Sequence, residues 1–295
     1  MSQFLQATLY GLLQGGLFAM IAVGFSLVWG IMNVINLAQG SFVIIGAYIA
    51  WELSAQAGLD PFVGMFIAAA ILFVVGYLLQ RVLINLVVNA PVYITLLLTF
   101  GIDLMLTQAM NIVFTGNFRS IPTSYASRGI QILPHVFLPL GRFLTFGVAL
   151  VVTILLAVMV SRTRTGMSIT ATGMDRGAAR LMGINARHVY ALVFGIGAAT
   201  AGMAGALYGT VGTFSPADGA HLTLISFVIA VLGGLGNLYG ALAGGIVLGL
   251  IESWGGVYLP GAWENAIAFL VFVIVLLVRP QGLVGRSYYA ARTEV

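Results

Sequence analysis

One ionisable side chain lies in the middle of an apolar run. Asp103 stands about 11 residues into the run 92–114, which places its carboxyl roughly 16 Å along a helix and near the centre of a bilayer. A carboxylate at that depth costs about 2.5–3.5 kcal/mol unless it is paired or hydrated. Asp103 is therefore a candidate contact for a substrate ammonium group or for a proton. The structural alternative is a hydrogen bond to backbone, to Thr99 or to Thr107, each four residues away.

Amide side chains gather between two apolar runs near the N-terminus. Asn33, Asn36 and Gln39 lie between Gly30 and Gly40. Irregular backbone survives at membrane depth only where it is buried in protein or faces a water-filled path. The pattern predicts a broken or re-entrant segment whose amides line a translocation pathway. An ordinary turn at the membrane interface is the alternative.

Glycines recur at every fourth position late in the chain, at Gly236, Gly240 and Gly244. Small residues on one helix face let two helix backbones approach closely, so we expect these three to mark a packing face. Asn237 lies among them, in a Gly-rich stretch that weakly repeats the pattern around Asn36. We therefore add Asn237 to the candidate pathway residues, with chance similarity as the alternative.

The most polar part of the chain contains a short amphipathic segment. Asp175 is suited to N-cap a helix there, and Gly183 to end it in a left-handed cap. Between them Ala178, Leu181 and Met182 would form one apolar stripe. A helix of about two turns is marginal alone in water, so the stripe needs a partner surface. That surface belongs either to the same bundle or to a separate protein.

Composition assigns the chain to helical membrane proteins. Of its 295 residues, 60% are hydrophobic and 7% are charged, against roughly a quarter charged in a soluble domain. The chain has no cysteine and no lysine, which excludes disulfides, thiolate chemistry and a standard Walker A site. No spacing of His, Ser, Asp or Glu suggests a catalytic or metal site, and no basic run suggests nucleic-acid binding. The sequence predicts a conduit rather than an enzyme.

Apolar runs long enough to cross a bilayer, or slightly shorter, make up most of the sequence. They occupy residues 9–29, 42–53, 62–83, 92–114, 143–160, 189–211, 222–238, 241–258 and 262–278. Eight or nine crossings result, because the region 29–53 can contain one or two. The sequence thus predicts an all-α polytopic membrane protein. We expect a single transmembrane domain over residues 1–295, with an extended loop over 115–138.

The arginines orient these crossings. Nine of the 12 fall on one predicted side: Arg81, five in the segment 161–188, and three in the C-terminal tail. The positive-inside rule then places the segment 161–188 and the C-terminus in the cytoplasm. The apolar stripe would also lie there.

Four motifs, in order, resemble the permease subunits of the branched-chain amino-acid family of ABC importers, and the LivH-like half most closely. The similarity extends over nearly the whole chain. The motifs are residues 24–30 (Gly-Phe-Ser-Leu-Val-Trp-Gly) with 36–40 (Asn-Leu-Ala-Gln-Gly) and 46–48 (Gly-Ala-Tyr); 164–166 (Arg-Thr-Gly) with 175–184; 231–236 (Val-Leu-Gly-Gly-Leu-Gly) with 240–241 and 244–245; and 279–285 (Arg-Pro-Gln-Gly-Leu-Val-Gly).

The resemblance implies an ABC importer permease fold within a heteromeric importer of the bacterial inner membrane. The expected partners are a second related permease, two cytoplasmic ATPases and a periplasmic substrate-binding protein, beside the lipid bilayer. ATP and Mg²⁺ would bind to the ATPases, with no cofactor in this chain. The segment that contacts the ATPases would comprise Asp175, Arg176, Ala178, Ala179, Leu181, Met182, Gly183 and Ile184.

Three positions depart from the family pattern. The family usually has His where Gln39 stands, often a basic residue near Thr170, and a small or neutral polar residue near Asp103. Amides, urea and aromatic acids therefore stay open as substrates beside branched-chain amino acids. Without the resemblance, the competing hypothesis is a secondary transporter or channel that uses Asp103 as an ion or proton site.

Overall fold

The computed structural model describes residues 2–123, 125, 129–133, 136–258, 263–279 and 281–284. Within these residues the chain is mostly helical, with one antiparallel hairpin of β1 (Gly129–Leu133) and β2 (Val136–Pro139). The helices, in chain order, are α1 (Ser2–Met32), α2 (Gln39–Ala57), α3 (Pro61–Leu79), the π-helical turn η1 (Gln80–Ile84), α4 (Asn85–Val87), α5 (Val92–Phe114), α6 (Leu140–Arg162), α7 (Arg164–Met174), α8 (Arg176–Leu181), α9 (Ala186–Val211), α10 (Asp218–Gly233), α11 (Leu238–Tyr258) and α12 (Trp263–Val278).

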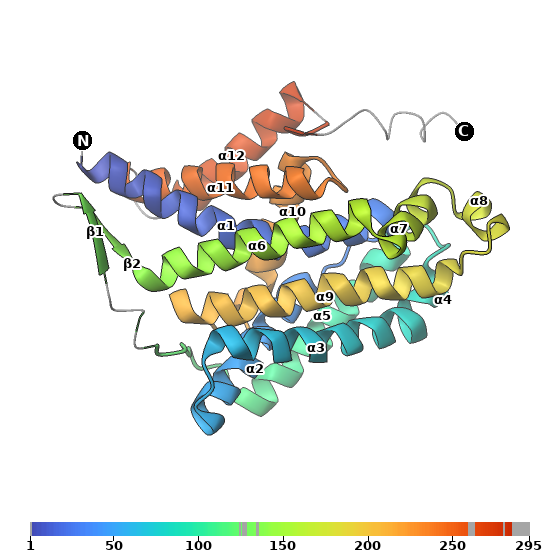
Figure 1. Cartoon of the computed structure of the whole chain (residues 1–295), viewed down its shortest axis with the longest axis horizontal. Helices are drawn as coiled ribbons and strands as arrows, with labels where there is room; N and C mark the ends of the chain where they lie inside the picture. Colours follow the sequence, from blue (N-terminus) through green and yellow to red (C-terminus); the bar gives the residue numbers. More distant parts are fainter. Residues whose placement is uncertain are drawn as a thin grey trace.

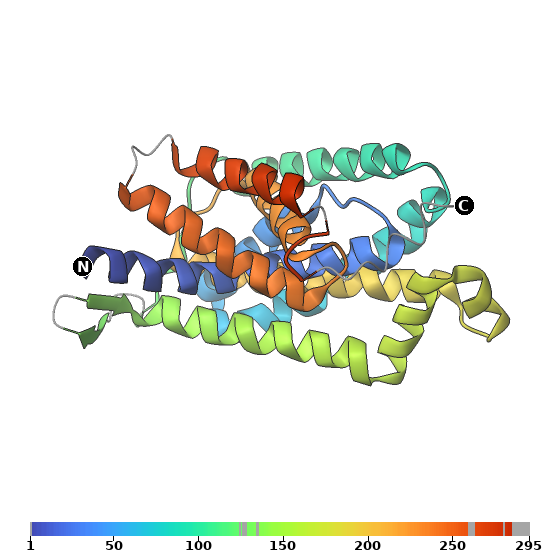
Figure 2. The same ribbon diagram turned by 90° about the horizontal axis from the view of Figure 1, so that it is seen from above.

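Most of the long helices run along the longest axis of the molecule (Figure 1). The short helices α7 and α8 lie at one end, which we call the α8 end. The strands β1 and β2 and the start of α1 lie at the other, which we call the hairpin end. Figure 2 shows the molecule from above, with the hairpin end and the α8 end on the same sides as in Figure 1 and with α11 beside α1.

Helices α1 and α9 form the inside of the bundle and are buried over most of their length. Helices α3, α5 and α6 form its outside and expose apolar side chains such as Val74, Leu97 and Leu155. A helical bundle with a buried inner layer and an apolar outer surface is the arrangement that a lipid environment requires, because lipid offers no partner to backbone polar groups.

Glycine lets α1 and α11 pack with their backbones in contact. A Cβ atom at Gly249 would lie 2.5 Å from the carbonyl oxygen of Gly11, and one at Gly245 would lie 2.6 Å from the backbone nitrogen of Ala19. Neither distance is possible for a real side chain, so any larger residue there would force the two helices apart. Close backbone approach of this kind replaces the hydrophobic effect as a source of helix association in membranes.

The glycines expected to form a packing face lie where α10 meets α11. A Cβ atom at Gly240 would lie 2.2 Å from the carbonyl oxygen of Gly233, and one at Gly244 would lie 2.7 Å from that of Ile229. Gly236 belongs to the connection between the two helices and has a φ of 81°, in the left-handed region that favours glycine.

The expected apolar runs correspond to helices, but three points qualify the expectation. Six helices among the described residues are long and apolar enough to span a bilayer, so eight or nine crossings are not established. The run 222–238 is not one helix: α10 stops at Gly233 because Gly234, with a φ of 103°, leaves helical geometry. The loop expected over 115–138 also contains the strands of the hairpin, which its polar composition did not indicate.

The contact between α10 and α11 generates a stability prediction. Gly240→Ala forces the two backbones apart and should lower the free energy of unfolding by about 1–3 kcal/mol. Thermal unfolding in detergent measures this loss.

The matched control is Gly147→Ala in α6, where an added Cβ atom meets nothing within 4 Å. Alanine there should leave stability unchanged or raise it by up to about 1 kcal/mol, because alanine favours the helix. Equal shifts in the two variants would contradict the packing role of Gly240.

Candidate functional site

The backbone is unwound between α1 and α2, over residues 33–38. Asn33 has a φ of 55°, a left-handed conformation that asparagine tolerates better than most residues. Its side chain is exposed. The break expected from the amide-rich sequence is therefore present, and the region 29–53 contains two helices rather than one.

Asn36 and Gln39 hold this break together from inside the protein. Both side chains are buried, and the Asn36 Nδ2 donates to Gln39 Oε1 at 3.3 Å. The Asn36 Oδ1 accepts from the backbone nitrogen of Ala38, and the Gln39 Nε2 donates to the carbonyl oxygen of Ile21 at 3.0 Å. The two amides thus form hydrogen bonds with one another, with the backbone of α1 and with the backbone of the unwound segment.

Asp103 faces the same region from α5. The residue is 8% exposed, and its Oδ1 accepts from the Ser41 hydroxyl at 2.5 Å. The Ser41 Oγ lies 3.2 Å from the Thr107 Oγ1. The partner of Asp103 is thus Ser41 of α2 rather than the expected Thr99 or Thr107, and Thr107 contacts Ser41 instead.

Thr99 is not the partner of Asp103, because its hydroxyl serves the unwound backbone instead. It donates to the carbonyl oxygen of Ile35 at 2.8 Å and accepts from the backbone nitrogen of Leu37 at 3.3 Å. Thr99 therefore supplies α5 with a second polar contact to the break.

Thr223 of α10 forms hydrogen bonds with the backbone at the break from the opposite side. Its Oγ1 accepts from the backbone nitrogen of Gly40 at 2.8 Å and donates to the carbonyl oxygen of Leu37 at 3.0 Å. A Cβ atom at Gly40 would lie 1.8 Å from the carbonyl oxygen of Gly219, so α2 begins in direct backbone contact with α10.

We call this group the polar seam: the unwound residues 33–38 with Gln39, Ser41, Thr99, Asp103 and Thr107. Ser41 and the role of Thr99 were not predicted. The spacing of Thr99, Asp103 and Thr107 at every fourth position is the signal that marks them as one helix face. No comparable signal pointed to Ser41.

Asn237 lies apart from the seam, at the connection between α10 and α11. Its Oδ1 accepts from the backbone nitrogen of Gly240, as an N-cap does, and its Nδ2 donates to the carbonyl oxygen of Val284 at 3.0 Å. The end of α1 nevertheless meets this connection, because a Cβ atom at Gly30 would lie 2.4 Å from the Cα of Gly236.

The amphipathic segment forms α8, at the α8 end of the molecule (Figure 1). The Asp175 carboxylate N-caps it by accepting from the backbone nitrogens of Gly177 and Ala178 at 2.7 and 3.0 Å. Gly183, with a φ of 82°, follows its C-terminus. Both capping expectations are confirmed.

The apolar stripe of α8 has no partner within the described chain. Leu181 is 90% exposed and Met182 is 83% exposed, and Ala178 is exposed beside them. Ala179 instead faces the bundle and is buried, while Ile184 is half-buried. The stripe is therefore not packed on its own bundle.

Arg176 fixes α8 to the rest of the molecule. Its guanidinium lies over the ring of Tyr190, 5.3 Å from the centroid, and its Nη1 donates to Asn89 Oδ1. These contacts tie α8 to α9 and to the residues that follow α4. The exposed leucine and methionine are thus presented on a tethered helix.

Metal chemistry finds no support in the part of the chain that the structure describes. No three His, Asp or Glu side chains of those residues come together in a way that could hold a metal ion. The geometry thus gives a mostly buried polar seam and, on α8, an exposed apolar stripe.

Comparison with known proteins identifies the family. Residues 7–276 match the family model described as the permease component of the branched-chain amino acid transport system. The chain is 33% identical to the high-affinity branched-chain amino acid transport system permease protein BraD of Pseudomonas aeruginosa, with 96% of each chain covered.

Other relatives are also named as permeases of branched-chain amino acid transport. The chain is 30% identical to the LivH permease protein of Escherichia coli over 96% of each chain. It is 28% identical to a probable LivH permease of Methanocaldococcus jannaschii, over 93% of this chain and 90% of that one. No solved structure matches. This chain belongs to the permease components of the branched-chain amino acid transport systems.

Proposed function

We propose that the chain is the membrane-spanning subunit of an ATP-driven importer and that α8 couples it to separate ATPase subunits. The observation that carries the proposal is the exposure of Leu181 and Met182 on a capped, tethered helix. Two apolar side chains held away from their own bundle favour burial in a partner, because burying each stabilises a contact by about 1.5–3 kcal/mol.

The partners follow from the same proposal. Two ATPases would hold ATP and Mg²⁺, since this chain has no lysine for a Walker A site. A second, related permease and a substrate-binding protein on the opposite face would complete the importer. The chain itself would catalyse no reaction.

The proposed location is a bacterial inner membrane, with the segment 161–188 and the C-terminus in the cytoplasm. The positive-inside rule supports this orientation, because five arginines lie in the segment 161–188, against Arg119, Arg128 and Arg142 on the other predicted side. The hairpin end would then face the binding protein.

The proposed substrates are branched-chain amino acids or related small polar or aromatic solutes. The names of the relatives support the first of these. We propose that substrate passes along the polar seam, where Asp103 could receive an ammonium group and the unwound backbone could offer carbonyl oxygens.

The coupling role predicts the behaviour of two variants on α8. Leu181→Asp and Met182→Asp should each abolish transport and the stimulation of ATPase activity by substrate-loaded binding protein, because a carboxylate cannot be buried in an apolar contact. Both activities are measured on the reconstituted transporter in liposomes.

The matched control is Leu181→Met, which keeps the apolar surface and should retain transport. Insertion into the membrane should be equal in all three variants, because none of the changes touches a buried residue. Normal stimulated ATPase activity in Leu181→Asp would count against the docking role of α8.

The pathway role generates a prediction for Asp103. Asp103→Asn preserves an oxygen that can accept the Ser41 hydroxyl but removes the ability to carry negative charge. If the carboxylate contacts a substrate ammonium group, uptake at low substrate concentration should fall by about tenfold or more, since a hydrogen bond between charged groups contributes about 1.5–3 kcal/mol.

A purely structural Asp103 would leave uptake unchanged in Asp103→Asn, because the hydrogen bond to Ser41 persists. The same assay tests the driving force. Transport that continues without ATP and follows an imposed proton gradient would overturn the ATP-driven proposal.

A further inference from the structure

A cavity opens among α1, α6 and α9 on the side of the molecule toward the hairpin end. Its volume is about 130 Å³. Three side chains of α1, Leu13, Leu17 and Phe18, form an apolar wall, and Val211 of α9 extends it. This wall suits a small aliphatic or aromatic group.

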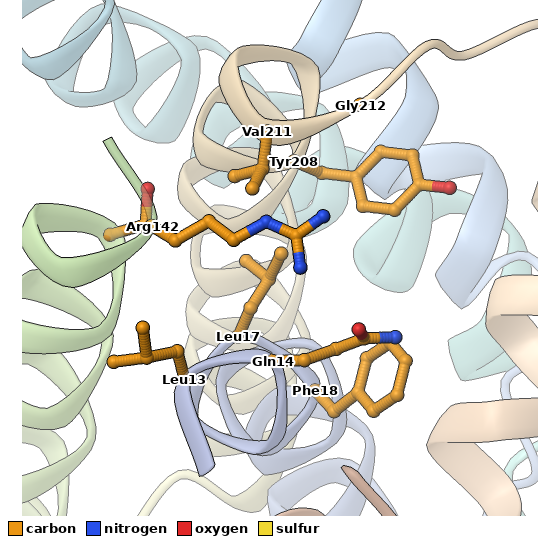
Figure 3. Close-up of a pocket in the computed structure, with 9 residues that line it drawn as sticks. Leu13, Gln14, Leu17, Phe18, Arg142, Tyr208, Val211 and Gly212 are labelled. Carbon is orange, nitrogen blue, oxygen red and sulfur yellow. The ribbon is translucent and has the colours of Figure 1, made fainter. Parts of the chain in front are cut away.

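Arg142 supplies a positive charge to the cavity. Figure 3 shows its guanidinium reaching across the cavity, between Tyr208 on one side and Leu17 and Gln14 on the other. The guanidinium stacks on the ring of Tyr10, 5.0 Å from the centroid. Among the described residues Arg142 has no carboxylate partner, so its fork of N–H donors is available to an anion.

Thr145, which lies on α6 like Arg142, adds a buried hydroxyl to the lining of the cavity. Its side chain is 1% exposed, and its Oγ1 has no hydrogen-bond partner among the described residues. A buried polar atom without a partner is costly, and a rotation about χ1 that turned this hydroxyl into the cavity would let a bound polar group remove that cost.

A carboxyl group lies behind the opposite wall. The Gln14 Nε2 donates to the Oε2 of Glu252, which is buried, at 3.4 Å. With its amide nitrogen directed to Glu252, Gln14 retains its Oε1 as an acceptor at the cavity. The cavity therefore has a cation on one side, an amide acceptor backed by a carboxyl group on another, and apolar side chains between them.

We propose that this cavity is a binding subsite for a free amino acid with an apolar side chain. The α-carboxylate binds Arg142 and Thr145, the ammonium group lies toward Gln14, and the side chain packs on Leu13 and Phe18. The proposal rests on the proposed function, because the hairpin end is then where substrate arrives. The site would receive substrate before it reaches the polar seam.

The phosphate of an anionic lipid could also bind Arg142, but the cavity favours an amino acid. The Gln14 Oε1 is an acceptor that a lipid phosphate, which has no N–H donor, would leave unused. The Glu252 carboxyl behind Gln14 also suits a ligand that carries both charges rather than an anion alone.

Binding of radiolabelled leucine tests the proposal. The full chain, expressed with its transporter partners, is placed in phosphatidylcholine nanodiscs without binding protein. Saturable leucine binding is expected, and Arg142→Gln should raise its Kd by about 10- to 100-fold. The same variant should hardly change the Kd of 3-methylbutylamine, which is leucine without its carboxylate. A general structural defect would weaken the binding of both ligands.

Thr145→Val has a matched control on the same helix. Thr153 is also buried on α6, and its Oγ1 likewise finds no partner in the part of the chain that the structure describes, but it does not line the cavity. Thr145→Val should raise the Kd of leucine by about fivefold, as expected for one lost hydrogen bond, and Thr153→Val should leave it unchanged.

Three outcomes would overturn the subsite. They are the absence of saturable leucine binding, equal leucine affinity in Arg142→Gln and the wild type, and loss of leucine binding when phosphatidylglycerol replaces phosphatidylcholine. The last outcome would assign the cavity to lipid phosphate. ATP-dependent uptake, measured in parallel, separates this failure from failure of the proposed function: normal uptake with no leucine binding rejects the subsite alone.

Discussion

A bilayer offers no hydrogen bonds to the backbone, and this constraint shapes the centre of the molecule. The chain leaves helical geometry over residues 33–38, where carbonyl oxygens and N–H groups lose their helical partners. Thr99 of α5 and Thr223 of α10 supply replacements, and Asn36 supplies another. The positions of α5 and α10 beside α2 therefore follow from the need to satisfy one unwound segment.

Glycine allows the helices around the unwound segment to pack closely enough for these hydrogen bonds to form. The 38 glycines of the chain include those that let α1 meet α11 and α2 meet α10 with backbone in contact. Close approach brings the Thr223 hydroxyl within reach of Gly40 and Leu37. Packing by small residues and hydrogen bonding of the break thus depend on one another, since a side chain at Gly40 would separate the donor from its acceptor.

The long apolar runs predict the helices well, because a crossing helix needs about 20 apolar residues; the run 92–114 coincides with α5. The end of α10 was placed wrongly because the Gly-rich stretch 233–236 was counted within the run 222–238, whereas the helix stops at Gly233 and Gly234 leaves helical geometry. The caps of α8 follow from local chemistry at Asp175. The Ser41 partner of Asp103 does not follow from local chemistry, because 62 residues separate the two and only the packing of α2 on α5 brings them together.

Helix α5 differs from the other long helices in how it is attached. It exposes most of its surface, and its inner face meets the bundle through Thr99, Asp103 and Thr107 as well as through a stack of Phe114 on Tyr48. Hydroxyl and carboxyl groups that separate can bond to water at little cost, whereas parted apolar faces cannot. An outward swing of α5 would therefore break hydrogen bonds that water can replace, and it would wet the unwound segment, but it would also part Ile102 and Met110 from the core.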